Sequence, residues 1–135
     1  MKSLLPIVIV LALATGYGLW YQRSRGKVVV KSDKGLITGS MIGAALGSRA
    51  TLVQFSSAFC SPCRATRMLL EDVTDTMSDV AYVEVDAETN LELVRTLDIR
   101  STPTTLFLDR TGHEVGRAMG APKRDQVLSA ISAIR

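Results

Sequence analysis

Short runs rich in Val, Thr and Phe alternate with segments of helical periodicity in the second half of the chain, and this order constrains the fold most. The expected strands and helices are, in order, β 51–55, α 61–77, β 80–86, α 88–97, β 104–108, β 114–119 and a closing helix from Pro122. Strands separated by helices are expected to pair in parallel, and the last two, joined by a turn at 109–112, to pair antiparallel. The sequence therefore predicts an α/β fold in which helices cover both faces of a mixed central sheet.

Each expected helix carries apolar side chains at helical spacing, which predicts one buried face per helix. These residues are Ala65, Leu69, Val73 and Met77 in the first helix, Leu91, Val94 and Leu97 in the second, and Val127, Ile131 and Ile134 in the third. With 135 residues, of which 47% are hydrophobic and 21% charged, the chain can bury one core but not two. We therefore expect one globular domain, at 41–135, and an appendage before it.

An uncharged run of 18 residues, Leu4 to Tyr21, stands near the N-terminus. As a helix it would be about 27 Å long, close to the hydrocarbon thickness of a bilayer. Trp20 and Tyr21 at its end fit the aromatic belt at a membrane surface. Residues 1–21 are therefore expected to form a single-pass anchor in the cell membrane. Two alternatives stay open: a signal peptide cleaved near "ALA" at 12–14, and a buried helix of a soluble protein.

A polar tether at 22–40 is expected to join this anchor to the domain, and its Val28–Val30 run can form an edge strand. The basic residues of the tether are Arg23, Arg25, Lys27, Lys31 and Lys34, against Lys2 on the other side of the anchor. The positive-inside rule then places the domain in the cytoplasm, with an extracytoplasmic domain as the alternative. The net charge of +3 comes partly from this flank and the other basic residues are scattered, so no nucleic-acid partner is expected.

The only two cysteines, Cys60 and Cys63, lie at the junction between the first expected strand and the following helix. Pro62 suits the first turn of that helix. Two residues three positions apart on a helix have Cα atoms about 5 Å apart, which a disulfide accepts. The pair is therefore predicted to open and close with little movement of the backbone.

The start of the helix should also tune the chemistry of Cys60. Free backbone N–H groups and the positive end of the helix dipole favour a thiolate there, which lowers the pKa of the thiol. Arg64 and Arg67 are expected to add to this positive field. Cys60 is thus predicted to attack a disulfide, and Cys63, inside the helix, to resolve the product.

Two other roles of the cysteines are less consistent with the sequence. A zinc site needs about four ligands, but the only histidine, His113, falls in an expected hairpin turn about 50 residues away. A purely structural disulfide would close a four-residue loop, which removes little entropy from the unfolded chain. A redox pair is the favoured interpretation.

Three segments together resemble the thioredoxin family: "FSSAFCSPCRATRMLLEDV", "RSTPTTLFLDRTG" and "GRAMGAPKRDQVLSAI". The resemblance implies a thioredoxin fold, with Cys60 as nucleophile and Cys63 as resolving cysteine. It also implies a cis peptide bond before Pro103, which would place the Thr102 backbone beside the cysteines to bind an extended substrate segment. Gly112 and Gly120 match two glycines whose role in the family looks conformational.

The sequence departs from the family pattern around the cysteines. Phe59 stands in the place of a tryptophan that contacts substrates, and Ser61 replaces a glycine before Pro62. Gln54 occupies the position of a buried aspartate that moves a proton for the resolving thiol. Because an amide cannot titrate, Cys63 is expected to lose its proton more slowly near neutral pH.

The sequence as a whole therefore predicts a membrane-anchored thiol–disulfide oxidoreductase that reduces or exchanges disulfides of protein substrates. An upstream reductase or electron donor must restore its dithiol, and no metal or organic cofactor is expected. The alternatives are a binding module with idle cysteines, an extracytoplasmic disulfide oxidase or isomerase, and a reductant for cytochrome assembly.

Overall fold

The computed structural model of the protein describes residues 4–24, 28–29 and 35–135. Residues 25–27 and 30–34 of the expected tether, Val30 among them, lie outside the described residues. The helices and strands are α1 (Leu5–Ser24), β1 (Val28–Val29), α2 (Gly39–Ile42), β2 (Ala50–Ser56), α3 (Ser61–Asp75), β3 (Val80–Asp86), α4 (Leu91–Thr96), β4 (Thr104–Asp109), β5 (Glu114–Met119) and α5 (Arg124–Ser132).

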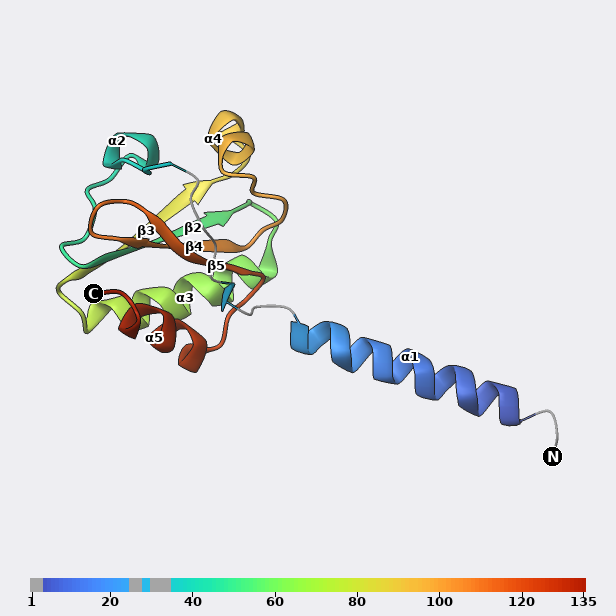
Figure 1. The fold of residues 1–135 in the computed structure, drawn as a ribbon. Helices are drawn as coiled ribbons and strands as arrows, with labels where there is room; N and C mark the ends of the chain where they lie inside the picture. The colour runs from blue at the N-terminus through green and yellow to red at the C-terminus, as the bar shows by residue number, and fades with distance from the viewer. Residues whose placement is uncertain (1–3, 25–27, 30–34) are drawn as a thin grey trace.

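The strands form one mixed sheet in the order β1-β5-β4-β2-β3, which confirms the α/β architecture predicted from the sequence (Figure 1). β2 pairs in parallel with β3, and β5 pairs antiparallel with both β4 and β1. The expectation that β4 would also be parallel is wrong, because β4 pairs antiparallel with β2. The six residues of α4 rise only about 9 Å. A seven-residue strand is about 23 Å long, so this helix is too short to return the chain to the other end of the sheet.

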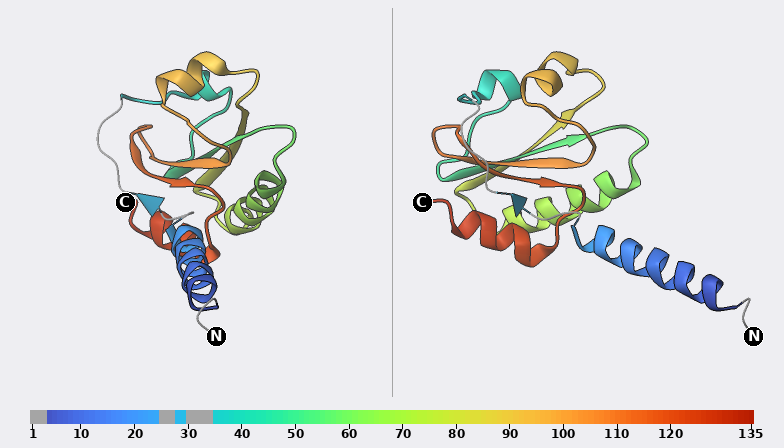
Figure 2. Two further views of the ribbon diagram at one scale, coloured as in Figure 1. Left: turned by 90° about the vertical axis from the view of Figure 1, so that its right-hand side faces the viewer. Right: turned by 45° about the vertical axis from the view of Figure 1, so that its right-hand side comes forward.

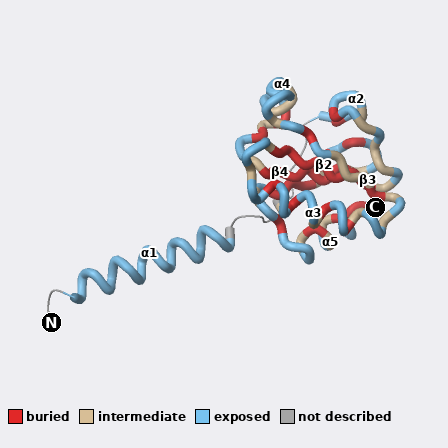
Figure 3. The backbone as a smooth tube through the Cα atoms, turned by 180° about the vertical axis from the view of Figure 1, so that it is seen from behind, coloured by how far each residue is buried: buried red, intermediate tan, exposed pale blue. Residues whose placement is uncertain are grey.

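The helices divide between the two faces of the sheet, with α3 and α5 on one face and α2 and α4 on the other (Figure 2). Under α3 and α5 the core includes Leu52, Leu70, Phe107, Val127 and Ile131. Under α2 and α4 it includes Ile37, Val53, Phe55, Leu106 and Leu108. β2 is buried at all seven positions, as a strand between two neighbours and two helix layers should be. Figure 3 shows this buried centre, with exposed residues on the outer helices.

Several helix details differ from the sequence expectation. The buried residues of α3 are Cys63, Thr66, Leu70 and Val73, while Ala65 is exposed, because the buried face is set by Cys63 at the sheet edge. Leu91, expected on the buried face of the second helix, is 55% exposed. The residues that pack into the core there are Leu97 and Ile99, which follow α4. The closing helix begins at Arg124, not at Pro122, and the Lys123 N–H donates to the Gln126 side chain over 2.9 Å.

α1 is long and apolar enough to cross a membrane over Leu5–Arg23, with a mean hydropathy of 1.4, and none of this span is buried. It extends away from the rest of the chain in Figure 1. A signal sequence near an N-terminus has the same properties, so this helix is a candidate span or signal sequence.

A buried ion pair within β5, absent from the sequence analysis, is hydrogen-bonded to the end of α4. A β-bulge beside Leu108 brings Glu114 and Arg117 to the same side of β5, where Arg117 is 4% and Glu114 8% exposed. The Arg117 Nη2 atom lies 2.7 Å from Glu114 Oε2 and donates to the Leu97 carbonyl over 3.1 Å. Arg117 therefore fixes the chain just before it enters the loop that leads to Pro103.

Arg117→Met should lower the free energy of unfolding by about 3–5 kcal/mol, because it leaves the Glu114 carboxylate buried without a partner. Urea denaturation followed by far-UV circular dichroism measures this loss. The matched control is Arg124→Met, which breaks an exposed ion pair with Asp72 and should cost about 1 kcal/mol or less. Equal losses of unfolding free energy in the two variants would contradict the assignment of Arg117 and Glu114 as a buried pair.

Candidate redox site

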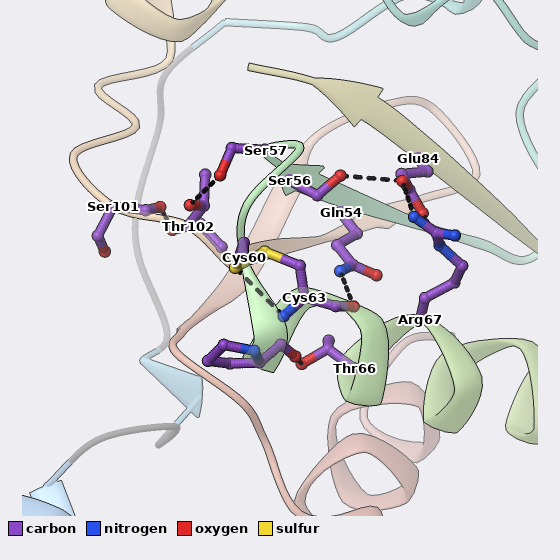
Figure 4. Close-up of a disulfide and its surroundings, with 12 residues drawn as sticks. Gln54, Ser56, Ser57, Cys60, Cys63, Thr66, Arg67, Glu84, Ser101 and Thr102 are labelled. Atoms are coloured by element: carbon purple, nitrogen blue, oxygen red, sulfur yellow. Dashed lines mark hydrogen bonds and ion pairs between the residues drawn. A yellow bond between two sulfur atoms is a disulfide. The ribbon is translucent and has the colours of Figure 1, made fainter. Parts of the chain in front are cut away.

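The site forms where β2 ends and α3 begins. Cys60 is the N-cap of α3 and Cys63 lies in its first turn, and the two form a disulfide with Cα atoms 5.2 Å apart (Figure 4). This distance agrees with the spacing predicted from helical geometry. Cys60 is partly exposed and Cys63 is 2% exposed, so a partner from solution reaches Cys60 first.

The Cys60 sulfur accepts a hydrogen bond from the first turn of α3. The Cys63 N–H donates to Cys60 Sγ over 3.2 Å, and Pro62, without an N–H, lies between them in sequence. This donor and the positive end of the helix both stabilise negative charge on Cys60 when the disulfide is open.

Arg67, expected to add to this positive field, is paired in the structure with a carboxylate that offsets its charge. Its guanidinium pairs with Glu84 on β3, with Nη2 2.6 Å from Oε1. The Ser56 hydroxyl donates to the same oxygen over 2.9 Å. Burial raises the pKa of Glu84, but the hydrogen bonds from Arg67 and Ser56 outweigh it and hold this pKa below the ordinary value. Arg64 is exposed and borders the same pocket beside the disulfide, so it supplies the remaining positive charge.

Gln54 is fully buried behind the disulfide, and both ends of its amide are occupied. Its Nε2 donates to the Cys63 carbonyl over 2.9 Å, and its Oε1 accepts from the Tyr82 hydroxyl over 2.7 Å. The same hydroxyl lies 3.2 Å from Glu84 Oε2. Burial and, next, the charge of Glu84 raise the pKa of Tyr82, so its hydroxyl remains protonated and acts as a donor.

Tyr82 and Glu84 are site residues that the sequence analysis missed. Gln54 pairs with Glu84 in the parallel β2–β3 register, so their side chains lie on the same face of the sheet. Tyr82 is two residues earlier on β3 and shares that face. The alternation in "VAYVEVD" contained this signal, but only the pairing register connects it to Gln54.

The second half of the site is the loop before β4. The Thr102–Pro103 peptide bond is cis. The Thr102 and Ser57 hydroxyls form a hydrogen bond of 3.2 Å, which joins this loop to the cysteine loop. The Gly120 N–H donates to the Pro103 carbonyl over 2.8 Å, and Gly120 has a φ of 87°, a conformation that favours glycine.

The surface around Cys60 combines one apolar side chain with a polar pocket. Phe59 is 99% exposed, and Ser61 and Pro62 are exposed on the other side of Cys60. A pocket of about 210 Å³ opens beside the disulfide. Its lining consists of Ser56, Ser57, Ala58, Cys60, Cys63, Arg64, Arg67, Glu84 and Asp86.

Within the described residues, the structure has no cluster of three or more His, Cys, Asp or Glu side chains that could hold a metal ion. His113 lies in the β4–β5 turn, where its Nδ1 is 2.9 Å from the Thr111 hydroxyl.

Comparison with known proteins agrees with this geometry. The family model described as Thioredoxin matches residues 43–133. Thioredoxin H2-1 of Oryza sativa subsp. japonica is 32% identical over 88 residues, which are 65% of this chain and 62% of that protein. The chain thus spans less than two thirds of this relative. The thioredoxin of Mycobacterium bovis is 31% identical over 88 residues, covering 64% of this chain and 75% of that protein.

Solved structures give the same answer for the fold. The X-ray structure of Fasciola hepatica thioredoxin aligns with a TM-score of 0.59 and 26% identity, over 66% of this chain and 84% of that one. A thioredoxin from Nicotiana alata aligns with a TM-score of 0.59 and 26% identity, over 65% of this chain and 75% of that one. Because the family model matches well over half of the sequence and the cysteine pair lies at the expected junction, the chain belongs to the thioredoxin family.

Proposed function

We propose that the chain is a membrane-anchored thiol–disulfide oxidoreductase that reduces disulfides of protein substrates through Cys60 and Cys63. The observation that carries this proposal is the Cys63 N–H directed at Cys60 Sγ at the start of α3. The Ser57–Thr102 hydrogen bond joins this cysteine loop to the loop before β4. Family membership supports disulfide-containing protein substrates and protein reductants as partners.

The reaction is a sequence of two thiol–disulfide exchanges. The Cys60 thiolate attacks one sulfur of the substrate disulfide, which breaks that bond and leaves the other substrate sulfur as a thiolate that takes a proton. The Cys63 thiol then loses its proton and attacks Cys60, which releases the second substrate thiol and forms the Cys60–Cys63 disulfide. Two electrons have moved to the substrate, so an upstream reductase or electron donor must return two electrons to the pair.

The remaining roles follow from the positions of the side chains. Thr102, hydrogen-bonded to Ser57 of the cysteine loop, and Pro103 would bind the substrate backbone, while the exposed Phe59 would contact its side chains. Ser61 and Pro62 set the first turn of α3. Gln54 holds the Cys63 carbonyl but has no proton to exchange, so the Cys63 proton must leave through the polar pocket.

We further propose that residues 1–21 form an uncleaved single-pass anchor, 22–40 a tether and 41–135 the catalytic domain. The apolar α1 and the basic residues that follow it, Arg23, Arg25 and Lys27, support this arrangement. Because these basic residues outnumber Lys2 at the other end, the domain is assigned to the cytoplasmic side. Labelling of Cys60 in intact cells with a membrane-impermeant thiol reagent tests the assignment, and reaction would place the domain outside.

The full-length protein in detergent should reduce insulin disulfides far faster than free dithiothreitol alone. Cys60→Ser should remove this activity, and Cys63→Ser should accumulate a mixed disulfide with insulin, seen on non-reducing gels. Ser78→Ala, an exposed change outside the site, is the matched control and should leave the rate unchanged. A wild-type rate no better than that of free dithiol would instead indicate a binding module with idle cysteines.

Gln54→Asp should speed resolution of the mixed disulfide at pH 7 by about 10²-fold relative to Gln54→Asn, because only the aspartate can act as a general base. The two variants have side chains of the same length, so the comparison separates charge from the loss of the Gln54 hydrogen bonds. Rapid-mixing measurements of the resolution step from pH 6 to 9 give the rates. Identical pH profiles for Asp and Asn would contradict the expected role of this position.

Glu84→Gln should destabilise the protein at pH 7 more than at pH 3. The pKa of Glu84 lies below its ordinary value of 4.5, so its ionised form stabilises the fold above that pH. This stabilisation is lost as the pH falls through the lowered pKa. Chemical denaturation at both pH values measures this stabilisation. The free energy of unfolding of Arg67→Met should likewise approach that of the wild type at low pH. A pH-independent loss in both variants would contradict the ion-pair assignment.

A further inference from the structure

The pairing of β1 fixes the end of the sheet at which the chain arrives from α1. Val28 pairs with Ala118 and Val29 with Arg117, antiparallel. β5 runs toward the redox site, since Met119 is its last residue and the next N–H, that of Gly120, donates to the Pro103 carbonyl. β1 therefore begins at the redox end of the sheet and runs away from it.

The connection between α1 and β1 is short. Three residues, 25–27, separate Ser24 from Val28. Four Cα steps of 3.8 Å span at most about 15 Å. The end of α1 also borders a groove with the start of α5, lined by Leu19, Arg23, Lys123 and others. α1 therefore leaves the domain beside the redox site.

Two views of the molecule agree with this placement. Figures 1 and 2 show α1 extending from the edge where β5 ends and α3 begins, while the C-terminus lies at the opposite end.

The side chains at this edge suit a membrane surface. Phe59 is 99% and Met119 49% exposed, and they stand next to Cys60 and to the Pro103 loop. Lys123 and Arg23 add positive charge at the groove between α1 and α5. Exposed apolar side chains and basic residues together favour the boundary between headgroups and acyl chains.

We propose that the Cys60–Cys63 pair faces the bilayer, and that its partner is an integral membrane protein whose reacting sulfurs lie at the same membrane surface. This inference rests on the proposed role of α1 as an uncleaved anchor. With so short a connection, sulfurs at the membrane surface are presented to Cys60 at a high effective concentration, whereas a disulfide in bulk solution gains no such advantage.

A lipid-linked disulfide tests this geometry directly. The probe is a phosphatidylethanolamine whose headgroup amine carries a spacer ending in a 2-pyridyl disulfide. The Cys60 thiolate attacks the spacer sulfur and expels pyridine-2-thiolate, which becomes the absorbing thione on protonation. Cys63 then attacks Cys60 and releases the lipid thiol. Each reduced protein therefore gives one pyridine-2-thione and one lipid thiol, and ends with the Cys60–Cys63 disulfide.

The experiment uses the pre-reduced full-length protein in phosphatidylcholine and phosphatidylglycerol vesicles that contain the probe. One variant carries a 20-residue Gly/Ser insertion after Ser24, and a second carries residues 1–24 after Arg135, at the opposite end of the domain. A water-soluble 2-pyridyl disulfide is the control substrate, and flotation with vesicles is the control for anchoring. The native protein should react with the lipid probe about tenfold faster than either variant, and all three should react equally with the soluble probe.

The outcomes separate this inference from the proposed function. Equal rates of the three proteins on the lipid probe, with normal flotation and soluble activity, would overturn the membrane-facing site alone. Loss of flotation by the native protein would overturn the anchor and this inference together. Failure of the native protein on the soluble probe would overturn the redox function itself.

Discussion

The hydrogen bond from the Cys63 N–H to Cys60 Sγ, at the first turn of α3, is the interaction on which the site depends. It exists because β2 delivers Cys60 to the start of the helix. β2 is buried along its whole length and paired on both sides, with β3 and with β4. Since β4 begins directly after Pro103, the same central strand also fixes the cis-proline loop relative to the cysteines. The two halves of the site are thus held by one rigid element.

The replacement of the expected carboxylate by Gln54 changes what surrounds the resolving cysteine. Gln54, Tyr82, Glu84 and Arg67 form one chain of hydrogen bonds behind the disulfide. Its charges lie at the outer end, on Glu84 and Arg67, and its inner end, next to Cys63, is a neutral amide. Buried charge beside Cys63 is thereby avoided, since an unpaired buried carboxylate is costly. The consequence is that a proton from Cys63 must travel through the pocket.

Local features of this fold were predictable from sequence, and features set by distant pairings were not. The cysteine spacing was predictable because three residues on a helix fix a distance wherever the helix lies. The direction of β4 was predicted wrongly because it depends on the short length of α4. The Arg117–Glu114 pair depends on a β-bulge, and the Arg67–Glu84 pair depends on the β2–β3 register. Neither feature can be read from the pattern of apolar and polar residues along one segment. The edge that we propose to face the membrane is located by the pairing of Val28 with Ala118, which the sequence does not show.

The most direct test of the account is the reduction potential of the Cys60–Cys63 pair in the full-length protein, measured by equilibration against defined dithiol and disulfide buffers. A disulfide reductase predicts about −270 mV or lower, in the range of thioredoxin. A value of about −180 to −120 mV would identify a disulfide donor or isomerase. It would contradict both the proposed reducing direction and the proposed cytoplasmic placement of the domain.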